Sequence, residues 1–128
     1  MIITFAGGGT SPLDGVPAIT AALSIPRGLA VTAAGDLPLV DTGAVKVRRV
    51  STAGVISTVA GNGGANSGGD GGPATAAGLN NPISVAVDAT GNIFIAESSG
   101  HRVRRVSVTG TISTFAGSGI AGSTGGGG

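Results

Sequence analysis

The chain of 128 residues contains no cysteine, tryptophan or tyrosine, and only three phenylalanines and one histidine. Without cysteine there is neither a disulfide framework nor a thiolate metal site. Charged residues make up 10% of the chain and the net charge is +1, so there is no general excess of positive charge for binding a polyanion. No apolar run is long enough to span a bilayer, and the first residues lack the pattern of a signal peptide. We therefore expect no membrane insertion.

Glycine is the abundant residue, with 26 copies. Such a content is typical of low-complexity chains when it is spread evenly. Here the glycines gather at 7–9, 61–72 and 117–128, between segments rich in valine, isoleucine and alanine. This distribution predicts turns and loops within one folded unit. The positive mean hydropathy of +0.43 indicates surfaces that are meant to be covered.

The sequence repeats itself once, almost completely. Residues 14–61 align without a gap on residues 70–117 at an offset of 56, and 22 of the 48 positions are identical. A third, partial copy opens the chain, where Ile3-Thr4-Phe5-Ala6-Gly7 echoes Ser113-Thr114-Phe115-Ala116-Gly117. Self-similarity at a fixed period indicates stacked units that cannot bury their apolar faces alone.

Within each repeat, short β-rich runs alternate with glycine-containing turns. The runs lie at 29–33, 37–41, 45–51 and 55–59 in the first repeat and at 84–88, 93–97, 101–107 and 111–115 in the second. Four runs at roughly ten-residue spacing predict a four-stranded antiparallel meander. One such sheet per repeat is typical of a β-propeller blade.

A long glycine-rich connection, 61–82, precedes the strands of the second repeat. Pro73 suits the first position of a short helix, with an upstream turn set by Asp70. We expect one or two helical turns over 73–79, with Leu79 packed under the loop. The matching piece of the first repeat is 14–23.

The second repeat carries three specific strings. They are Asn81-Pro82-Ile83-Ser84-Val85-Ala86-Val87-Asp88, Gly91-Asn92-Ile93-Phe94-Ile95-Ala96-Glu97 and His101-Arg102-Val103-Arg104-Arg105-Val106, continued by Ile112-Ser113-Thr114-Phe115-Ala116-Gly117. Together they resemble an NHL repeat, the blade of mostly six-bladed propellers in bacterial and animal proteins. The insert at 60–74 is similar to the long-loop bacterial subtype of this repeat.

The first repeat departs from that pattern at several positions. Thr32 stands for the expected aspartate, Asp36 for the asparagine and Pro38 for an aromatic residue of the strand. Gly43-Ala44-Val45 replaces the usual Asn-His-like turn. A proline in a central strand removes a ladder hydrogen bond, so we expect a less regular first blade or a different functional face there.

Two basic clusters occupy the same place in the two repeats: Lys46-Val47-Arg48-Arg49 and His101-Arg102-Val103-Arg104-Arg105. Alternate residues of a strand share a face, so Arg49 and Arg105 fall on the side of the valines, where blades pack together. We therefore predict that these two arginines form interblade ion pairs or cap the backbone. The expected carboxylate partners are Asp41, Asp88 and Glu97.

The other basic residues are candidates for contact with a partner. They are Lys46, Arg48, His101, Arg102 and Arg104. A phosphate-contacting stripe is the functional alternative, because some NHL domains bind RNA. The chain lacks stacking aromatic residues and a basic excess, so we do not expect nucleic acid as a partner.

No combination of residues predicts a catalytic, metal or cofactor site. His101 stands alone, and the resemblance implies that its ring braces a loop by hydrogen bonding. The glycine-rich run 63–72 holds only Asp70, whereas calcium loops need several carboxylates. It also lacks the Lys-Ser/Thr pair of a phosphate loop. We therefore expect no enzyme, no metal and no cofactor.

We divide the chain into four parts. Residues 1–13 form a spare strand (2–5) and a loop, 14–61 the first NHL-like blade, 62–117 the long loop and the second blade, and 118–128 a glycine-rich tail. The expected fold is all-β, with two four-stranded antiparallel propeller blades that are part of a six-bladed propeller or of an open blade array.

Two blades leave an apolar flank exposed on each side, which favours association. Three chains in a closed ring, a piece of a longer array and an open head-to-tail filament are the alternatives. We expect a non-enzymatic propeller scaffold or interaction module that self-associates to complete its propeller and binds a protein or glycan partner. A structural subunit of an extracellular filament or assembly is one alternative. A propeller lyase or lactonase is another, which the missing ligands disfavour.

The expected location rests on the resemblance alone. It implies a secreted bacterial protein, whose export signal would lie outside this sequence.

Overall fold

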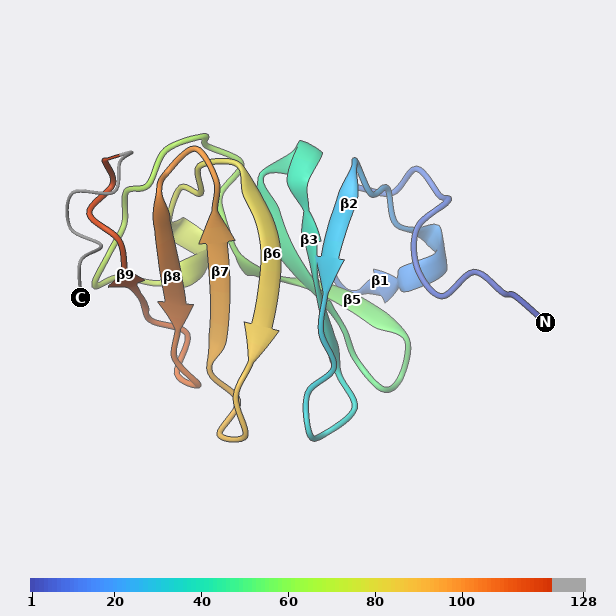
Figure 1. Cartoon of the computed structure of the whole chain (residues 1–128). Helices are drawn as coiled ribbons and strands as arrows, with labels where there is room; N and C mark the ends of the chain where they lie inside the picture. The colour runs from blue at the N-terminus through green and yellow to red at the C-terminus, as the bar shows by residue number, and fades with distance from the viewer. Residues whose placement is uncertain (121–128) are drawn as a thin grey trace.

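The computed structural model describes residues 1–120, which form two antiparallel sheets side by side (Figure 1). The described part contains no α-helix and only three short 3-10 turns. The predicted all-β fold with two propeller-like blades is confirmed, and the two blades do not close into a ring within the chain. The greater part of the predicted tail, from residue 121 on, lies outside the described residues.

The second sheet, which we call blade 2, is the regular one. It consists of β6 (Pro82–Val87), β7 (Ile93–Glu97), β8 (Arg102–Val106) and β9 (Ile112–Ala116), in this spatial order. The predicted meander is therefore correct, with strand ends displaced by one or two residues.

The first sheet, blade 1, has five strands. They are β1 (Val16–Pro17), β2 (Pro26–Leu29), β3 (Leu37–Asp41), β4 (Lys46–Val50) and β5 (Val55–Ala60), in the order β1-β5-β4-β3-β2. The short strand β1 pairs with the outer edge of β5.

The innermost strand of blade 1 is where the sequence prediction is wrong. A strand was expected over 29–33, but β2 covers 26–29 and makes only two register pairs with β3, whereas β6 makes five with β7. Pro38 explains the loss: its carbonyl accepts a hydrogen bond from the Ala30 N–H at 3.0 Å, but it has no N–H to return. The ladder therefore stops at Leu29, and blade 1 is less regular, as expected.

The spare strand predicted at 2–5 does not form. These residues carry no strand assignment and are exposed, and in Figure 1 the N-terminal segment runs away from the body of blade 1. The outer edge of β5, the strand that ends blade 1, is already paired with β1.

The predicted helical turns at 73–79 are reduced to one 3-10 turn, η3 (Ala74–Ala76), preceded by Pro73. Its counterpart in the first repeat is η1 (Ala18–Thr20). Leu79 is fully buried, as expected for a residue under the loop. A third 3-10 turn, η2 (Thr42–Ala44), joins β3 to β4.

In each blade a residue with left-handed backbone precedes the innermost strand, β2 or β6, and another precedes β4 or β8. In blade 2 these are Asn81 (φ 53°) and His101 (φ 52°), and in blade 1 they are Ile25 (φ 56°) and Val45 (φ 58°). Asparagine and histidine tolerate this region better than β-branched residues do. The Val45 departure from the repeat pattern therefore keeps the backbone of the turn at a cost in strain.

Candidate functional site: the blade interface and the two free flanks

Blade 1 and blade 2 pack through a continuous apolar interface. Strand β6 of blade 2 lies against β2 and β3 of blade 1. A side-chain hydrogen bond crosses the interface, where the Thr42 hydroxyl donates to the Pro82 carbonyl at 2.8 Å. The buried residues of this core are Val40, Val47, Ala60, Ala74, Ala77, Leu79, Val85, Ile93, Ile95, Val106 and Ile112.

The Leu79 side chain packs between the two blades. It is 0% exposed and belongs to the same buried cluster as Val47 and Ala60 of blade 1. A Cβ on Gly61 would lie 2.6 Å from the Val45 carbonyl oxygen and 3.1 Å from Leu79 Cδ1, and Gly61 has φ +95°. This close approach requires glycine, so the socket for Leu79 depends on a residue without a side chain.

Because the two repeats are equivalent, each interface position has a counterpart that lacks a neighbour. The free flank of blade 1 matches the side of blade 2 that faces blade 1: Leu23, Pro26, Leu29, Leu37 and Leu39 correspond to Leu79, Pro82, Val85, Ile93 and Ile95. The free flank of blade 2 matches the opposite side: Ala96, Val103, Phe115, Ala116 and Gly117 correspond to Val40, Val47, Val59, Ala60 and Gly61.

Exposure differs sharply between counterparts. Val85 is 9% exposed but Leu29 is 65% exposed. Ala60 is fully buried, whereas Ala116 is exposed. Phe115 is 59% exposed and packs edge-on against Phe94, with ring centroids 4.9 Å apart. Each free flank therefore presents the apolar side chains that the repeat buries when a neighbouring blade is present.

Both free flanks are hollowed. A hollow of about 390 Å³ on blade 1 is lined by apolar side chains and the N-terminal segment: Thr4, Phe5, Ala6, Leu23, Pro26, Arg27, Gly28, Leu29, Leu37 and Leu39. A second hollow of about 290 Å³ on blade 2 is lined by Glu97, His101, Arg102, Val103, Ala116 and Gly117. The residues of the second hollow include the counterparts of the Leu79 socket.

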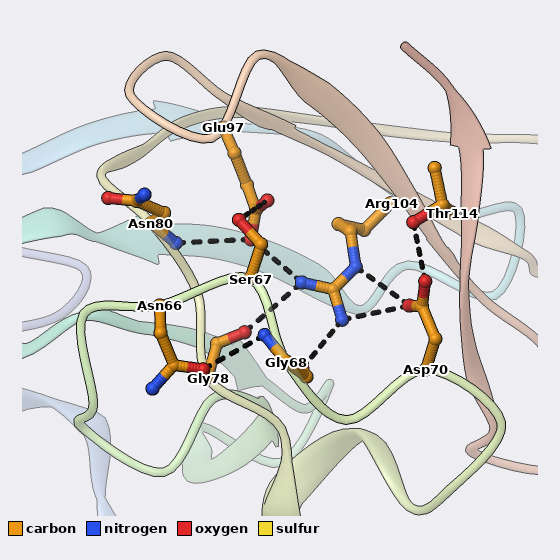
Figure 2. Close-up of polar contacts among 9 residues, drawn as sticks. All are labelled: Asn66, Ser67, Gly68, Asp70, Gly78, Asn80, Glu97, Arg104 and Thr114. Carbon is orange, nitrogen blue, oxygen red and sulfur yellow. Dashed lines mark hydrogen bonds and ion pairs between the residues drawn. The ribbon is translucent and has the colours of Figure 1, made fainter. Parts of the chain in front are cut away.

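A buried arginine holds the long loop of blade 2 onto its sheet (Figure 2). Arg104 is 0% exposed. Its Nε donates to Asp70 at 3.0 Å, and one of its terminal nitrogens donates to Glu97 Oε2 at 3.0 Å. The remaining donors reach the carbonyls of Gly78 and Gly68, at 3.1 and 2.9 Å. Every donor group of the guanidinium is therefore used, as burial of an arginine requires.

Glu97 is equally well satisfied on the other side. Its Oε1 accepts a hydrogen bond from the Ser67 hydroxyl at 3.0 Å, and its Oε2 accepts one from the Asn80 N–H at 3.1 Å (Figure 2). The loop from Ser67 to Asn80 is thus held by five of its residues, two bonded to Glu97 and three to Arg104.

The equivalent network in blade 1 is looser. Asp41 is one methylene shorter than Glu97, and its Oδ2 lies 3.6 Å from Arg48 Nη1. Asp41 Oδ1 still accepts from the Ser24 N–H at 2.7 Å, but Asp41 Oδ2 and Arg48 Nε are buried without a hydrogen-bond partner. A hollow of about 220 Å³ lies beside Asp41 and Arg48, with room for a longer side chain at position 41.

Two aspartates show lowered pKa values. Burial raises the pKa of Asp70, but the hydrogen bond from Thr114 and the charge of Arg104 outweigh it and hold that pKa below its ordinary value. The hydrogen bond from the Asn92 side chain, helped by the N–H groups of the turn, lowers the pKa of Asp88. Asp88 Oδ1 accepts from three successive N–H groups, at residues 90–92, so it shapes the turn between β6 and β7.

The structure assigns the predicted ion pairs to different arginines. Arg48 and Arg104, expected as exposed partner contacts, are buried and pair with Asp41 and Glu97. Arg49 is exposed and Arg105 half-buried, and neither forms an ion pair within the described residues. The side chain of Glu97 shares a face with that of Arg104 and not with that of Arg105, which is why the prediction failed.

The remaining predicted contact residues lie around the β3–β4 and β7–β8 turns. Lys46 and Arg102 are half-buried and His101 is exposed. His101 and Arg102 both line the hollow on the free flank of blade 2. Asp88 has no ion pair among the described residues and belongs to a turn far from this hollow in the sheet.

Sequence reasoning missed Asp14 and Asp70 as partners of the buried arginines. Arg48 pairs with Asp14 at 3.1 Å, and Arg104 with Asp70 at 2.9 Å. A signal was present, because both aspartates and both arginines are identical between the repeats. The pairs span 34 residues, so no local spacing rule brings them together.

Within residues 1–120 no group of three or more histidine, cysteine, aspartate or glutamate side chains could hold a metal ion. No helix in this part of the chain has the length and apolar character needed to cross a membrane.

Comparison with known proteins agrees with this geometry. A family model describing the teneurin NHL domain matches residues 63–125, which contain all of blade 2. The second repeat is therefore an NHL repeat, in a chain that has the β-propeller fold. No curated protein matches it in sequence.

Several solved structures share the propeller fold. A protein of unknown function from Bacteroides thetaiotaomicron is 26% identical, with a TM-score of 0.67 over 87% of this chain and 27% of that one. An auxiliary nutrient binding protein from the same organism is 23% identical, with a TM-score of 0.62 over 86% and 28%. Virginiamycin B lyase from Staphylococcus aureus is 14% identical, with a TM-score of 0.51 over 70% and 26%.

This chain spans between 26 and 28% of the length of these structures. At 23 and 14% identity the binding protein and the lyase support the fold alone.

Proposed function

We propose that this NHL protein is a non-enzymatic propeller module that self-associates through its blade flanks and serves as a scaffold. The observation that carries the proposal is the difference in exposure between repeat counterparts. The positions of the buried Leu79 and Val85 recur on the outside as Leu23, which is half-buried, and Leu29, which is 65% exposed. A further blade on either flank would remove this apolar surface from water.

The scaffold role is favoured over catalysis by what the polar groups do. The buried carboxylates and arginines of blade 2 are used up in holding the long loop, with every strong donor paired. Such a network stabilises a surface and offers no free nucleophile or base. Protein or glycan binding and an extracellular location are further parts of the proposal, and a filament is its open-ended form.

The proposal is tested by the mass of the purified chain in solution, measured by light scattering over a range of concentrations. Assembly into a discrete trimer supports a closed six-bladed ring, and large polydisperse species support a filament. A monomer at every concentration would contradict self-association.

A matched pair of variants makes the measurement specific. Phe115→Glu puts a charge on the free flank of blade 2, where the ring is 59% exposed, and should abolish association while the chain stays folded. Val108→Glu, at an equally exposed position in the β8–β9 turn, should leave the mass unchanged. Stoichiometric metal in the purified protein, or association that survives Phe115→Glu, would count against the proposal.

A further inference from the structure

We propose that the free flank of blade 1 binds the free flank of blade 2 of a second copy, head to tail, with Leu23 in the hollow beside Gly117. This inference rests on the proposed self-association and specifies its partner surface. The occupant is a second copy because the chain already contains this interface once, between its own two blades.

A leucine side chain on one flank of the chain matches a glycine-lined hollow on the other. Inside the chain, Leu79 packs against Gly61, where an added Cβ would come within 3.1 Å of the leucine. The counterpart of the socket is the hollow of about 290 Å³ that includes Val103, Ala116 and Gly117. The counterpart of the leucine is Leu23, on the opposite flank. Leu23 and the hollow that would receive it therefore lie on different flanks of the chain, so two copies would meet through two different surfaces, which is a heterologous contact.

The hydrogen bond across the internal interface also has counterpart residues on the two free flanks. The Thr42 hydroxyl donates to the Pro82 carbonyl across the internal interface. Ser98 occupies the place of Thr42, and Pro26 that of Pro82. Both are exposed, but the Ser98 hydroxyl donates to the Asn81 carbonyl of its own chain at 3.3 Å, so docking requires this hydroxyl to turn to the proline carbonyl of the next copy.

The N-terminal segment already contacts blade 1 in the way that the end of blade 1 contacts the second repeat. The Gly7 N–H donates to the Ala18 carbonyl at 2.9 Å, as the Gly61 N–H does to the Ala74 carbonyl at 2.9 Å. A Cβ added to Gly7 would lie 3.1 Å from Leu23 Cδ1, and a Cβ added to Gly61 would lie at the same distance from Leu79 Cδ1.

The sequence of this segment identifies what it imitates. Thr4-Phe5-Ala6-Gly7 is identical to Thr114-Phe115-Ala116-Gly117 at the end of β9. The flank of blade 1 is therefore shaped for a strand end of this sequence. Docking replaces residues 4–7 of one copy by residues 114–117 of the next, an exchange of like for like.

In this exchange, residues 4–7 of the chain compete with residues 114–117 of the second copy for the flank of blade 1. Phe5 is 58% exposed although it lines the hollow on blade 1, so it covers that hollow incompletely. A variant that loosens the segment, Phe5→Gly, should increase docking of the second copy, because less of the chain's own surface has to be displaced.

Crosslinking tests the geometry, since the native chain has no cysteine. Full-length Leu23→Cys and Ala116→Cys variants are mixed with a short bifunctional thiol reagent. We expect dimers that join the two different variants, at about tenfold higher yield than a mixture of Leu23→Cys with Val108→Cys. Phe5→Gly in the Leu23→Cys chain should raise the yield further.

An internal control shows that the reagent spans the socket. A single chain carrying Ala60→Cys and Leu79→Cys should close on itself without forming dimers. If this pair closes but Leu23→Cys joins mainly to itself, the copies meet blade 1 to blade 1 and the head-to-tail inference is overturned. If the chain is oligomeric by mass but the Leu23–Ala116 pair stays unlinked, self-association stands and this docking fails. A monomer that gives no crosslinks refutes both.

Discussion

Replacing Arg104 by methionine should destabilise the protein more than any other single charge removal in the described chain. The guanidinium is 0% exposed and makes contacts of 2.9–3.1 Å with Asp70, Glu97 and two carbonyls. Its removal leaves Glu97, which is 2% exposed, as a buried carboxylate with only neutral donors. Breaking one side of such a pair costs about 3–5 kcal/mol, a large share of a domain's stability.

The equivalent change in blade 1 should cost somewhat less. Arg48 lies 3.6 Å from Asp41, so a weaker ion pair is lost, but its removal still leaves Asp41, which is 0% exposed, with the Ser24 N–H as its hydrogen-bond donor. We expect Arg48→Met to lose about 3 kcal/mol. Arg105→Met, at a half-buried position without an ion pair in the described chain, should change the free energy of unfolding by less than about 0.5 kcal/mol.

The assay is urea denaturation followed by far-ultraviolet circular dichroism, because the chain has no tryptophan or tyrosine for fluorescence. Protein concentration is held constant, so that association does not alter the comparison. The double variant Arg104→Met/Glu97→Met should cost less than the sum of the single variants, since neither charge is then left alone. Equal costs for Arg104→Met and Arg105→Met would refute the argument.

Three further changes follow from the differences between the repeats and from the lowered pKa of Asp70. Asp41→Glu should extend the carboxylate into the hollow of about 220 Å³ and raise the urea midpoint, by about 1 kcal/mol of stability; a lower midpoint would show that the hollow cannot accept it. Ile25→Asn should also stabilise by about 1 kcal/mol, because Ile25 is exposed and has φ 56°, and it is checked by thermal unfolding against the matched exchange at the exposed Ile19. The folded pKa of Asp70 lies below its unfolded value of about 3.9, so its contribution is complete above that value and is lost as pH falls through the folded pKa. Asp70→Asn should therefore flatten the loss of stability on acidification below about pH 4, and an unchanged pH profile would contradict this assignment.

The blades were predictable because repetition and strand periodicity are local signals. The four strands of blade 2 agree with the prediction within one or two residues, and of the one or two helical turns predicted over 73–79 a single 3-10 turn forms. The shift of β2 was harder to foresee, although its cause is visible in the sequence. Pro38 was identified as a ladder breaker, but which neighbouring strand it shortens depends on which side of β3 lacks the N–H.

The ion pairs could not be derived from spacing alone. Strand alternation placed Arg104 and Arg105 on opposite faces correctly, but it did not say which face the long loop covers. Asp70 approaches Arg104 from that loop, 34 residues away. The pairing of identical residues between repeats, aspartate with aspartate and arginine with arginine, was the available clue.

The uneven divergence of the repeats bears on the function proposed. Blade 1 has relaxed its internal features, with Asp41 for the glutamate and Ile25 and Val45 at left-handed positions. Its outer flank has nonetheless kept leucine at 23, 29, 37 and 39, where the repeat has Leu79, Val85, Ile93 and Ile95. Three of these leucines pack in the core of blade 1 itself, since Leu39 is 5% exposed and Leu23 and Leu37 are half-buried, but Leu29 is 65% exposed. The exposure of Leu29 is explained if another blade covers this flank, and the hollow beside Ala116 and Gly117 is the counterpart of the surface that does so inside the chain.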